Sequence, residues 1–247
     1  MQYTPNVSLV AFYGSKPPPF RNLIQQLQNY LVEELEEQFQ PYVLEQIHGT
    51  MIGYEGVKTD KGILSQWFWE HRNEERYINL SASIDYIRHT QLLPLNIRLG
   101  GYHPNINYGS KNIDPSLFER SFQFINNFAV LRGWPFGEQQ ILSNLNQLRL
   151  EFQRFNLLHK YHPKADSLDN DFYIRLGVLK VKPSDEKIKL IENRIRNCLK
   201  ASCLVDILVD LENLSFVGYQ DTSLPVTTTK VIPLKAATVA QIELLYA

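Results

Sequence analysis

The sequence has few cysteines and no long run of apolar residues. Its two cysteines, Cys198 and Cys203, stand five positions apart, which matches neither a Cys-x-x-Cys motif nor a disulfide framework. We therefore expect two reduced structural thiols. No apolar run approaches the roughly 18–20 residues that cross a bilayer, and residues 1–13 lack the charged and apolar regions of a signal peptide. These absences predict a cytoplasmic protein with no membrane partner.

The chain also lacks an excess of either charge. Of its 247 residues, 25 are lysine or arginine and 26 are aspartate or glutamate, so the net charge is −1. Proteins that hold duplex nucleic acid rely on many phosphate contacts, so the balance predicts no duplex DNA partner, while a small basic pocket remains compatible with it. A hydrophobic fraction of 44% suits a globular protein with a real core. We expect residues 1–247 to form one domain.

Helical and strand patterns occur together along the chain, which predicts an α+β protein. Apolar residues spaced by threes and fours predict helices at 20–35, 77–93, 138–161 and 185–198. Short apolar or alternating runs predict strands at 7–13, 47–54, 95–102, 122–130, 171–179, 205–211, 214–219 and 228–234. A polar turn is expected at 56–62 and a loop at 103–115.

Two clusters of aromatic or imidazole side chains have both an ordinary and a functional interpretation. The run Trp67-Phe68-Trp69 could stack a nucleobase, but we favour a patch of the core. His159 and His162 have a spacing that suits a shared metal ion on a helix. No carboxylate or cysteine in the same turn completes a ligand set, and histidines suit the negative end of a helix dipole. We therefore expect no metal site.

The stretch at 47–54 combines a strand pattern with side chains that can carry chemistry. Side chains alternate along a strand, so His48 and Thr50 share one face, while Ile47 and Met51 lie on the other. An imidazole and a hydroxyl side by side can transfer a proton and donate a hydrogen bond to one anion. A lone strand histidine is more often structural, so the functional interpretation needs a second segment of the same kind.

The stretch at 171–179 is that second segment. Its alternate apolar side chains point into a core: Phe172, Ile174, Leu176 and Val178. Tyr173 and Arg175 share the opposite face. Each half of the chain thus has a helix, a strand with a polar pair, another helix and further strands. Two such lobes packed about a pseudo-two-fold axis would bring both polar pairs to one cleft.

At this point the chain resembles a family. Its order of elements and the segment His48-Gly49-Thr50-Met51 look like the two-histidine (2H) phosphoesterase superfamily, whose signature is two His-x-Thr/Ser-hydrophobic strands. The segment Ile232-Pro233-Leu234 resembles the end of the family's closing hairpin, so the resemblance spans roughly residues 7–234. It implies a two-lobed, pseudo-symmetric α+β fold, with antiparallel sheets lining a central cleft and helices outside. It also implies activity on cyclic or 2′–5′ phosphodiesters of nucleotides or RNA ends, without a metal or other cofactor.

The chain departs from this pattern at the second motif, where Tyr173-Ile174-Arg175 replaces His-x-Thr. We assign His48 the acid–base role, because the ordinary pKa of histidine lies near neutral pH. Thr50 and the planar guanidinium of Arg175 are expected to hold the phosphate. Tyr173, with an ordinary pKa of about 10, is a poor base but can donate a hydrogen bond or act as a weak acid.

Three interpretations therefore remain open. One is a working phosphodiesterase whose second proton comes from Tyr173 or from a histidine at His103, His159 or His162. Another is a catalytically inactive protein that binds a small phosphorylated ligand, a nucleotide, an RNA end or a protein partner. The third is a structural His48 beside a pocket that holds no ligand.

Overall fold

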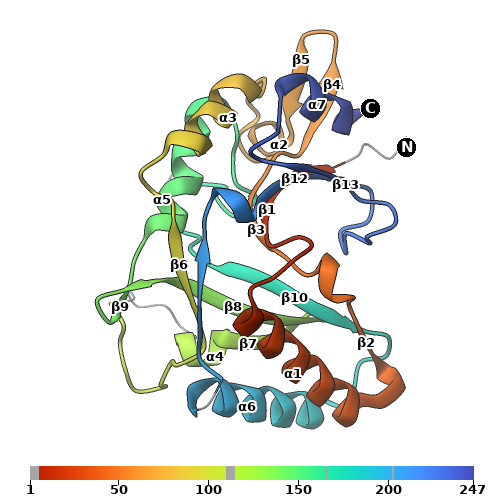
Figure 1. The fold of residues 1–247 in the computed structure, drawn as a ribbon, viewed down its shortest axis with the longest axis vertical. Helices are drawn as coiled ribbons and strands as arrows, with labels where there is room; N and C mark the ends of the chain where they lie inside the picture. Colours follow the sequence, from red (N-terminus) through yellow and green to blue (C-terminus); the bar gives the residue numbers. More distant parts are fainter. Residues whose placement is uncertain (1–5, 110–114, 165, 202) are drawn as a thin grey trace.

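The computed structural model describes residues 6–109, 115–164, 166–201 and 203–247, and within them strands and helices mix along the chain (Figure 1). The α-helices of this part are α1 (Pro18–Leu35), α2 (Gln66–Arg72), α3 (Leu80–His89), α4 (Leu117–Ser121), α5 (Asn144–Glu151), α6 (Asp185–Ala201) and α7 (Val239–Glu243). The strands are β1 (Asn6–Ala11), β2 (Phe39–Pro41), β3 (Gly49–Gly53), β4 (Gly56–Thr59), β5 (Gly62–Ser65), β6 (Leu95–Leu99), β7 (Phe122–Ile125), β8 (Phe128–Gly137), β9 (Gln140–Ile141), β10 (Phe172–Leu179), β11 (Val205–Val209), β12 (Leu214–Tyr219) and β13 (Lys230–Pro233). The predicted α+β class is confirmed.

Most of the strands join one antiparallel sheet. Its order is β11-β6-β8-β10-β3-β1-β12-β13, with β2 attached to β10 and with β7 and β9 attached to β8. β4 and β5 form a separate hairpin. The two predicted motif strands, β3 and β10, are therefore neighbours near the middle of the sheet, although more than a hundred residues separate them along the chain. The two-lobed, pseudo-symmetric arrangement and the single domain stay predictions.

The long helices bury the apolar stripes that the sequence pattern predicts. The buried positions of α1 recur at intervals of three and four: Phe20, Leu23, Ile24, Leu27, Leu31 and Leu35. The helix begins with two prolines, which have no backbone N–H to lose in a first turn. α1 packs on α6, β2, β10 and β11, and Figure 1 shows α1 and α6 together at the end of the molecule away from α2, α3 and α7.

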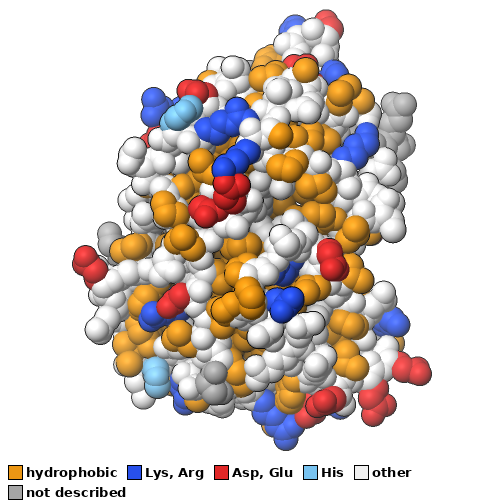
Figure 2. Space-filling view, viewed as in Figure 1, with side chains coloured by type: hydrophobic (Ala, Val, Ile, Leu, Met, Phe, Trp, Pro, Cys, Tyr) orange, Lys and Arg blue, Asp and Glu red, His pale blue; other side chains and the backbone are white. Residues whose placement is uncertain are grey.

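Side chains of both charges are present on the face of the molecule seen in Figure 2. On the face seen in Figure 2, basic and acidic side chains are interspersed among apolar ones and are not separated by sign. None of the helices in the described part of the chain combines the length and the apolar character that a bilayer crossing needs.

Two segments fold as hairpins that the sequence interpretation missed. The predicted strand 122–130 is instead β7 and the start of β8, joined by Asn126 and Asn127. Asn126 has φ of 55°, a left-handed conformation that asparagine tolerates in tight turns. The predicted turn 56–62 is likewise the β4–β5 hairpin.

The predicted helix 138–161 is wrong over most of its length. β8 continues to Gly137, and the helix α5 occupies only eight residues. A 3₁₀ turn, Phe152–Phe155, follows it and ends at Asn156, whose φ of 61° cannot continue a helix. A short helix plus a 3₁₀ turn produced the same spacing of apolar residues as one long helix. His159 and His162 therefore lie in a loop, and the helix-dipole interpretation of them does not apply.

Several other helices and strands are shorter than predicted. The helix expected at 77–93 is α3, which starts after Asn79, whose side chain accepts a hydrogen bond from the N–H of Ala82. The strand expected at 205–211 is β11, and that at 95–102 is β6. The loop expected at 103–115 includes residues 110–114, which lie outside the described residues.

The tryptophan cluster belongs only in part to the core. Residues 66–72 form α2, in which Phe68 is fully buried and Trp69 is half exposed. Trp67 stacks on His71 and donates from Nε1 to a carboxylate oxygen of Glu55 at 3.0 Å. Of the three aromatic rings, only that of Phe68 lies in the core.

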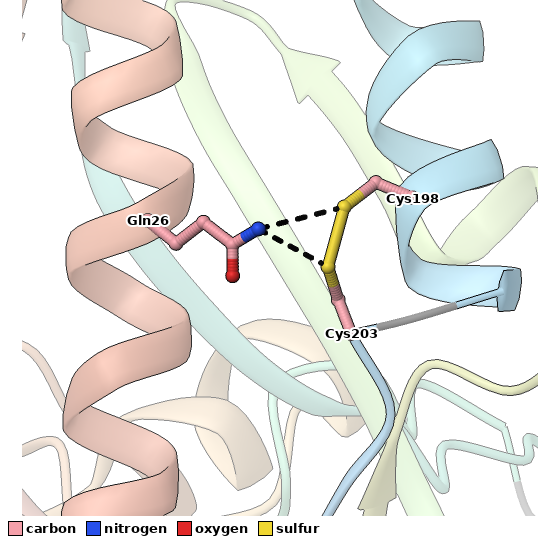
Figure 3. Close-up of a disulfide and its surroundings, with 3 residues drawn as sticks. All are labelled: Gln26, Cys198 and Cys203. Atoms are coloured by element: carbon pink, nitrogen blue, oxygen red, sulfur yellow. Dashed lines mark hydrogen bonds between the residues drawn. A yellow bond between two sulfur atoms is a disulfide. The ribbon is translucent and has the colours of Figure 1, made fainter.

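Cys198 and Cys203 form a disulfide, with the amide of Gln26 from α1 beside both sulfurs (Figure 3). The prediction of reduced thiols is therefore wrong. The chain turns back at the end of α6, where the N–H of Cys203 donates to the carbonyl of Cys198 at 3.1 Å. This turn brings the two Cα atoms within 5.8 Å, inside the range that disulfides span. Spacing alone does not indicate such a turn.

Candidate functional site

The two predicted motifs meet at one residue pair. β3 and β10 run antiparallel, with Gly49 opposite Ile174. In an antiparallel ladder the residues on either side of a pair are also opposite one another. Continuing the register by one residue in each direction therefore sets His48 beside Arg175 and Thr50 beside Tyr173. The imidazole of His48 and the guanidinium of Arg175 line the same cavity, and the charge of Arg175 contributes to the lowered pKa of His48.

Close packing explains why a glycine stands between His48 and Thr50. The ring of Phe172, on β10, lies over the Cα of Gly49, and a Cβ there would come within 2.1 Å of that ring. Phe172 is fully buried and packs edge-on against Phe12 at 6.5 Å between ring centroids. A glycine at position 49 therefore lets β3 approach β10 closely enough to align the two polar pairs.

A cavity of about 510 Å³ opens over this pairing. His48, Thr50, Tyr173 and Arg175 all line it. His48 stands immediately before β3, not inside a strand as predicted, and it is half-buried. The opposite face of β3 is fully buried, as predicted, with Met51 in the core.

The β10 side chains follow the predicted alternation until a bulge. Phe172, Ile174 and Leu176 are fully buried. The register against β8 shifts between Arg175 and Gly177, so the inward positions change there. Val178, predicted to point inward, is only half-buried, and Leu179 is buried instead. The bulge lies just beyond Arg175 and leaves the polar pair on one face.

His48 is held as a neutral base. Its Nδ1 lies 2.7 Å from the carbonyl of Gln46, and because a carbonyl only accepts, Nδ1 carries the proton. Nε2 is then left with a free lone pair. Burial lowers the pKa of His48 to about 4, the Gln46 carbonyl opposes this shift, and the positive charges of Arg175 and Lys16 add to it. The neutral imidazole is the form that accepts a proton.

Arg175 is held by an aromatic ring and a backbone carbonyl. Its guanidinium lies 4.0 Å from the ring centroid of Phe128, and Nη1 donates to the carbonyl of Thr222 at 3.2 Å. Among the residues that the structure describes, no carboxylate forms an ion pair with Arg175. The remaining donors of its fork can therefore serve an anion in the cavity.

Tyr173 lines the cavity with a phenol that stays protonated at neutral pH. Burial raises the pKa of its phenol, and the positive charges of Arg175 and Arg132 oppose that rise. The guanidinium of Arg132 lies 5.6 Å from the ring centroid of Tyr173. A phenol that stays protonated at neutral pH can donate to a phosphate oxygen but cannot act as a base.

Arg149 connects β3 to the residues just before β10, and sequence reasoning missed it. Its side chain is 2% exposed and forms an ion pair with Asp169 at 3.2 Å. Its guanidinium donates to four backbone carbonyls: Thr50 at 2.9 Å, Met51 at 2.9 Å, Asp169 at 3.1 Å and Asp171 at 3.2 Å. The available signal was an arginine between two leucines on the inner face of a helical pattern.

The charges that line the cavity leave an excess of cations. Arg149 is paired with Asp169, and Arg132 lies 3.4 Å from a carboxylate oxygen of Asp171. The remaining lining charges are Arg175, Lys160 and Glu55: two cations and one acid. Burial raises the pKa of Glu55, which weakens its negative charge. We therefore expect the cavity to favour an anionic ligand.

The three histidines considered as alternative sources of the second proton differ in their position relative to the cavity. His159 lines the cavity. His162 is buried, with its ring centroid 5.2 Å from that of His159, and His103 is exposed; neither is among the lining residues. Within the described residues, no group of three or more His, Cys, Asp or Glu side chains comes together in a way that could hold a metal ion.

Comparisons with known proteins give no family. No protein-family model and no curated protein matches the chain. The protein TT0787 of Thermus thermophilus has 13% identity and a TM-score of 0.42, covering 92% of this chain and 93% of that chain. ATU0111 of Agrobacterium tumefaciens str. C58, a conserved protein of unknown function, has 16% identity and a TM-score of 0.42, covering 88% and 81%. Neither is described as a 2H phosphoesterase, and likeness at this level supports no functional argument, so the family stays a prediction.

Proposed function

We propose that the protein binds the phosphate of a nucleotide or RNA end and hydrolyses a cyclic or 2′–5′ phosphodiester. The observation that supports this best is the pairing of Gly49 with Ile174, which aligns two polar pairs from distant parts of the chain over one cavity. The excess of cations at the cavity gives a second, independent reason to expect an anion.

The chemistry assigned to the site follows from the groups present. Nε2 of His48 takes a proton from the attacking water as the water oxygen bonds to phosphorus. Arg175, Thr50 and Tyr173 donate hydrogen bonds to the non-bridging oxygens, where negative charge increases in the transition state. The bond from phosphorus to the ribose oxygen then breaks, and the departing oxygen takes a proton from Tyr173, the weak acid of the site, which regains one from solvent.

The second candidate function is binding without turnover. It is favoured by Tyr173, which stands where a second histidine would be expected, because a phenol with a raised pKa is a weak acid at neutral pH. Thr50, Tyr173 and Arg175 would hold the anion equally well in such a protein. The two functions differ in turnover and not in affinity.

One titration separates these functions. The full chain is mixed with 2′,3′-cyclic nucleotides, and binding and product formation are both measured. Arg175→Gln is expected to weaken binding about 10–100-fold, because a hydrogen-bonded charge is lost. Arg194→Gln, on the exposed face of α6, is the matched control and should bind as the wild type does.

The outcomes are distinct. Binding with turnover supports the phosphodiesterase, and saturable binding without turnover supports the binding protein. The absence of both, or an affinity that Arg175→Gln leaves unchanged, would contradict a phosphate site at this cavity.

A further inference from the structure

The cavity extends along β3 from the phosphate end described above to a second polar end at Gly53 and Glu55. On β1 the partners of Gly49 and Gly53 are Ala11 and Ser8, which are three residues apart. At a strand rise of about 3.3 Å per residue, the two ends of the cavity are about 10 Å apart. A separation of this size matches the reach from the phosphate of a nucleotide to the outer edge of its base.

A bulge in β3 brings the second end to the same face as Thr50. The register against β1 shifts between Leu9 and Val10, which leaves Met51 as an extra residue on β3. The bulge changes the alternation of side chains by one position, so Thr50 and Gly53 both line the cavity although they are three residues apart. The cavity face of β3 is therefore continuous from the phosphate end to Gly53.

The carboxylate of Glu55 lies over Gly53 and is held in place by an indole. A Cβ at position 53 would come within 1.8 Å of Oε2 of Glu55, so the glycine makes room for this position of the carboxylate. Nε1 of Trp67 donates to Oε2 at 3.0 Å. A carboxylate has about four acceptor sites on its two oxygens, and the indole occupies one of them. Glu55 is therefore a fixed acceptor at the wall of the cavity.

The charge of this carboxylate is not cancelled by a salt bridge. Within the part of the chain that the structure describes, no lysine, arginine or histidine forms an ion pair with Glu55. Burial raises the pKa of Glu55, while its own backbone N–H, the indole of Trp67 and the charge of Lys160 oppose that rise. Hydrogen bonds donated by a ligand act in the same direction as these three groups. This end of the cavity therefore favours a ligand group that carries N–H donors.

Among the four common nucleobases, guanine matches such an acceptor best. Its N1–H and 2-amino group are adjacent donors on one edge, and an ionised carboxylate accepts from both. Adenine and cytosine each place an amino group beside a ring nitrogen that only accepts, and uracil places one N–H between two carbonyls. Each of those edges sets a lone pair against a carboxylate that has no proton to donate.

We propose that Glu55 is the base-recognition residue of the site and that it selects guanine nucleotides by accepting from N1–H and the 2-amino group. This inference rests on the proposed function, because the phosphate end anchors the nucleotide whose base reaches Glu55. Trp67 does not itself line the cavity. It is a positioning residue that holds the carboxylate.

The test compares guanosine 3′-monophosphate with inosine 3′-monophosphate, which differ only in the 2-amino group. Neither contains a phosphodiester, so binding to the full chain is measured without turnover. The wild type is expected to bind the guanosine compound about 10–100-fold more tightly, because inosine lacks one hydrogen bond to a charged group. Glu55→Gln should reduce this ratio to about one, since Trp67 retains the amide oxygen and the NH2 group then faces the donors of the base.

The matched control is Glu70→Gln. Glu70 lies on α2, its side chain accepts a hydrogen bond from Gln66, and it does not line the cavity. Its variant should keep the wild-type ratio between the two nucleotides. Arg175→Gln should weaken both nucleotides by the same factor and leave their ratio unchanged, because it acts on the phosphate.

These measurements separate base recognition from phosphate binding. A ratio near one in the wild type, or a ratio that Glu55→Gln leaves unchanged, would overturn base recognition by Glu55 while the phosphate site stands. If neither nucleotide binds to the wild type, the proposed function and this inference both fail. Should Glu55→Gln fail to fold, the wild-type ratio still decides, and adenosine or cytidine 3′-monophosphate binding as tightly as the guanosine compound would overturn the assignment.

Discussion

Replacing His48 with alanine is expected to slow hydrolysis of 2′,3′-cyclic nucleotides about 10²–10⁴-fold, because one positioned base is lost. Binding of the nucleotide should change much less, since Arg175, Thr50 and Tyr173 still hold the phosphate. The measurement is kcat and the dissociation constant for wild type and variant under the same conditions. A pH profile gives a second readout: since the pKa of His48 is about 4, wild-type kcat/KM should fall as the pH drops through that value and the base becomes protonated.

The matched control is His89→Ala. His89 lies at the end of α3, its side chain is 74% exposed, and it does not line the cavity. Its variant should keep wild-type activity. Equal activity of wild type and His48→Ala would remove His48 from the chemistry.

Replacing Arg149 with methionine is expected to lower the free energy of unfolding by about 3–5 kcal/mol, because it leaves a partly buried Asp169 without its ion pair. Four backbone carbonyls also lose their donor. Methionine fills much of the same volume, so the lost stability reflects the unpaired polar groups more than an unfilled cavity. The measurement is denaturant unfolding of the full chain, with the disulfide intact in both proteins.

Arg154→Met provides the comparison for this prediction. Arg154 follows closely in the chain, but its side chain is 70% exposed and pairs only with Glu151. Arg154→Met should leave the free energy of unfolding unchanged. Arg149→Lys keeps the charge without the planar fork. Its free energy of unfolding should lie between those of the wild type and Arg149→Met. If Arg149→Met unfolds at the wild-type denaturant concentration, the join between β3 and the start of β10 is not what holds the site together.

The strands that carry the site were predictable because their signals are local. A polar pair at alternate positions within an apolar run specifies a face, and both pairs line the cavity. The bulge after Arg175 was not predictable, since it depends on register against β8 and not on the sequence of β10. Val178 was misplaced for that reason.

The part of the site outside the motif strands depends on contacts between distant segments. Arg149 binds carbonyls of residues about a hundred positions earlier and twenty later. A helical pattern at 138–161 hid the loop that brings His159 to the cavity, because apolar spacing cannot distinguish one long helix from a short helix and a 3₁₀ turn. The disulfide was missed likewise, since it depends on how the chain turns at the end of α6.

The central claim is that His48 and Arg175 face the same anion, which Arg175 holds and toward which His48 presents its base. The most direct measurement is an experimental structure of the full chain bound to inorganic phosphate or a nucleoside monophosphate. We predict one phosphate whose oxygens accept from the guanidinium of Arg175 and whose hydroxyl donates to Nε2 of His48. A phosphate bound elsewhere, or one held by Arg175 with the imidazole out of reach, would contradict it.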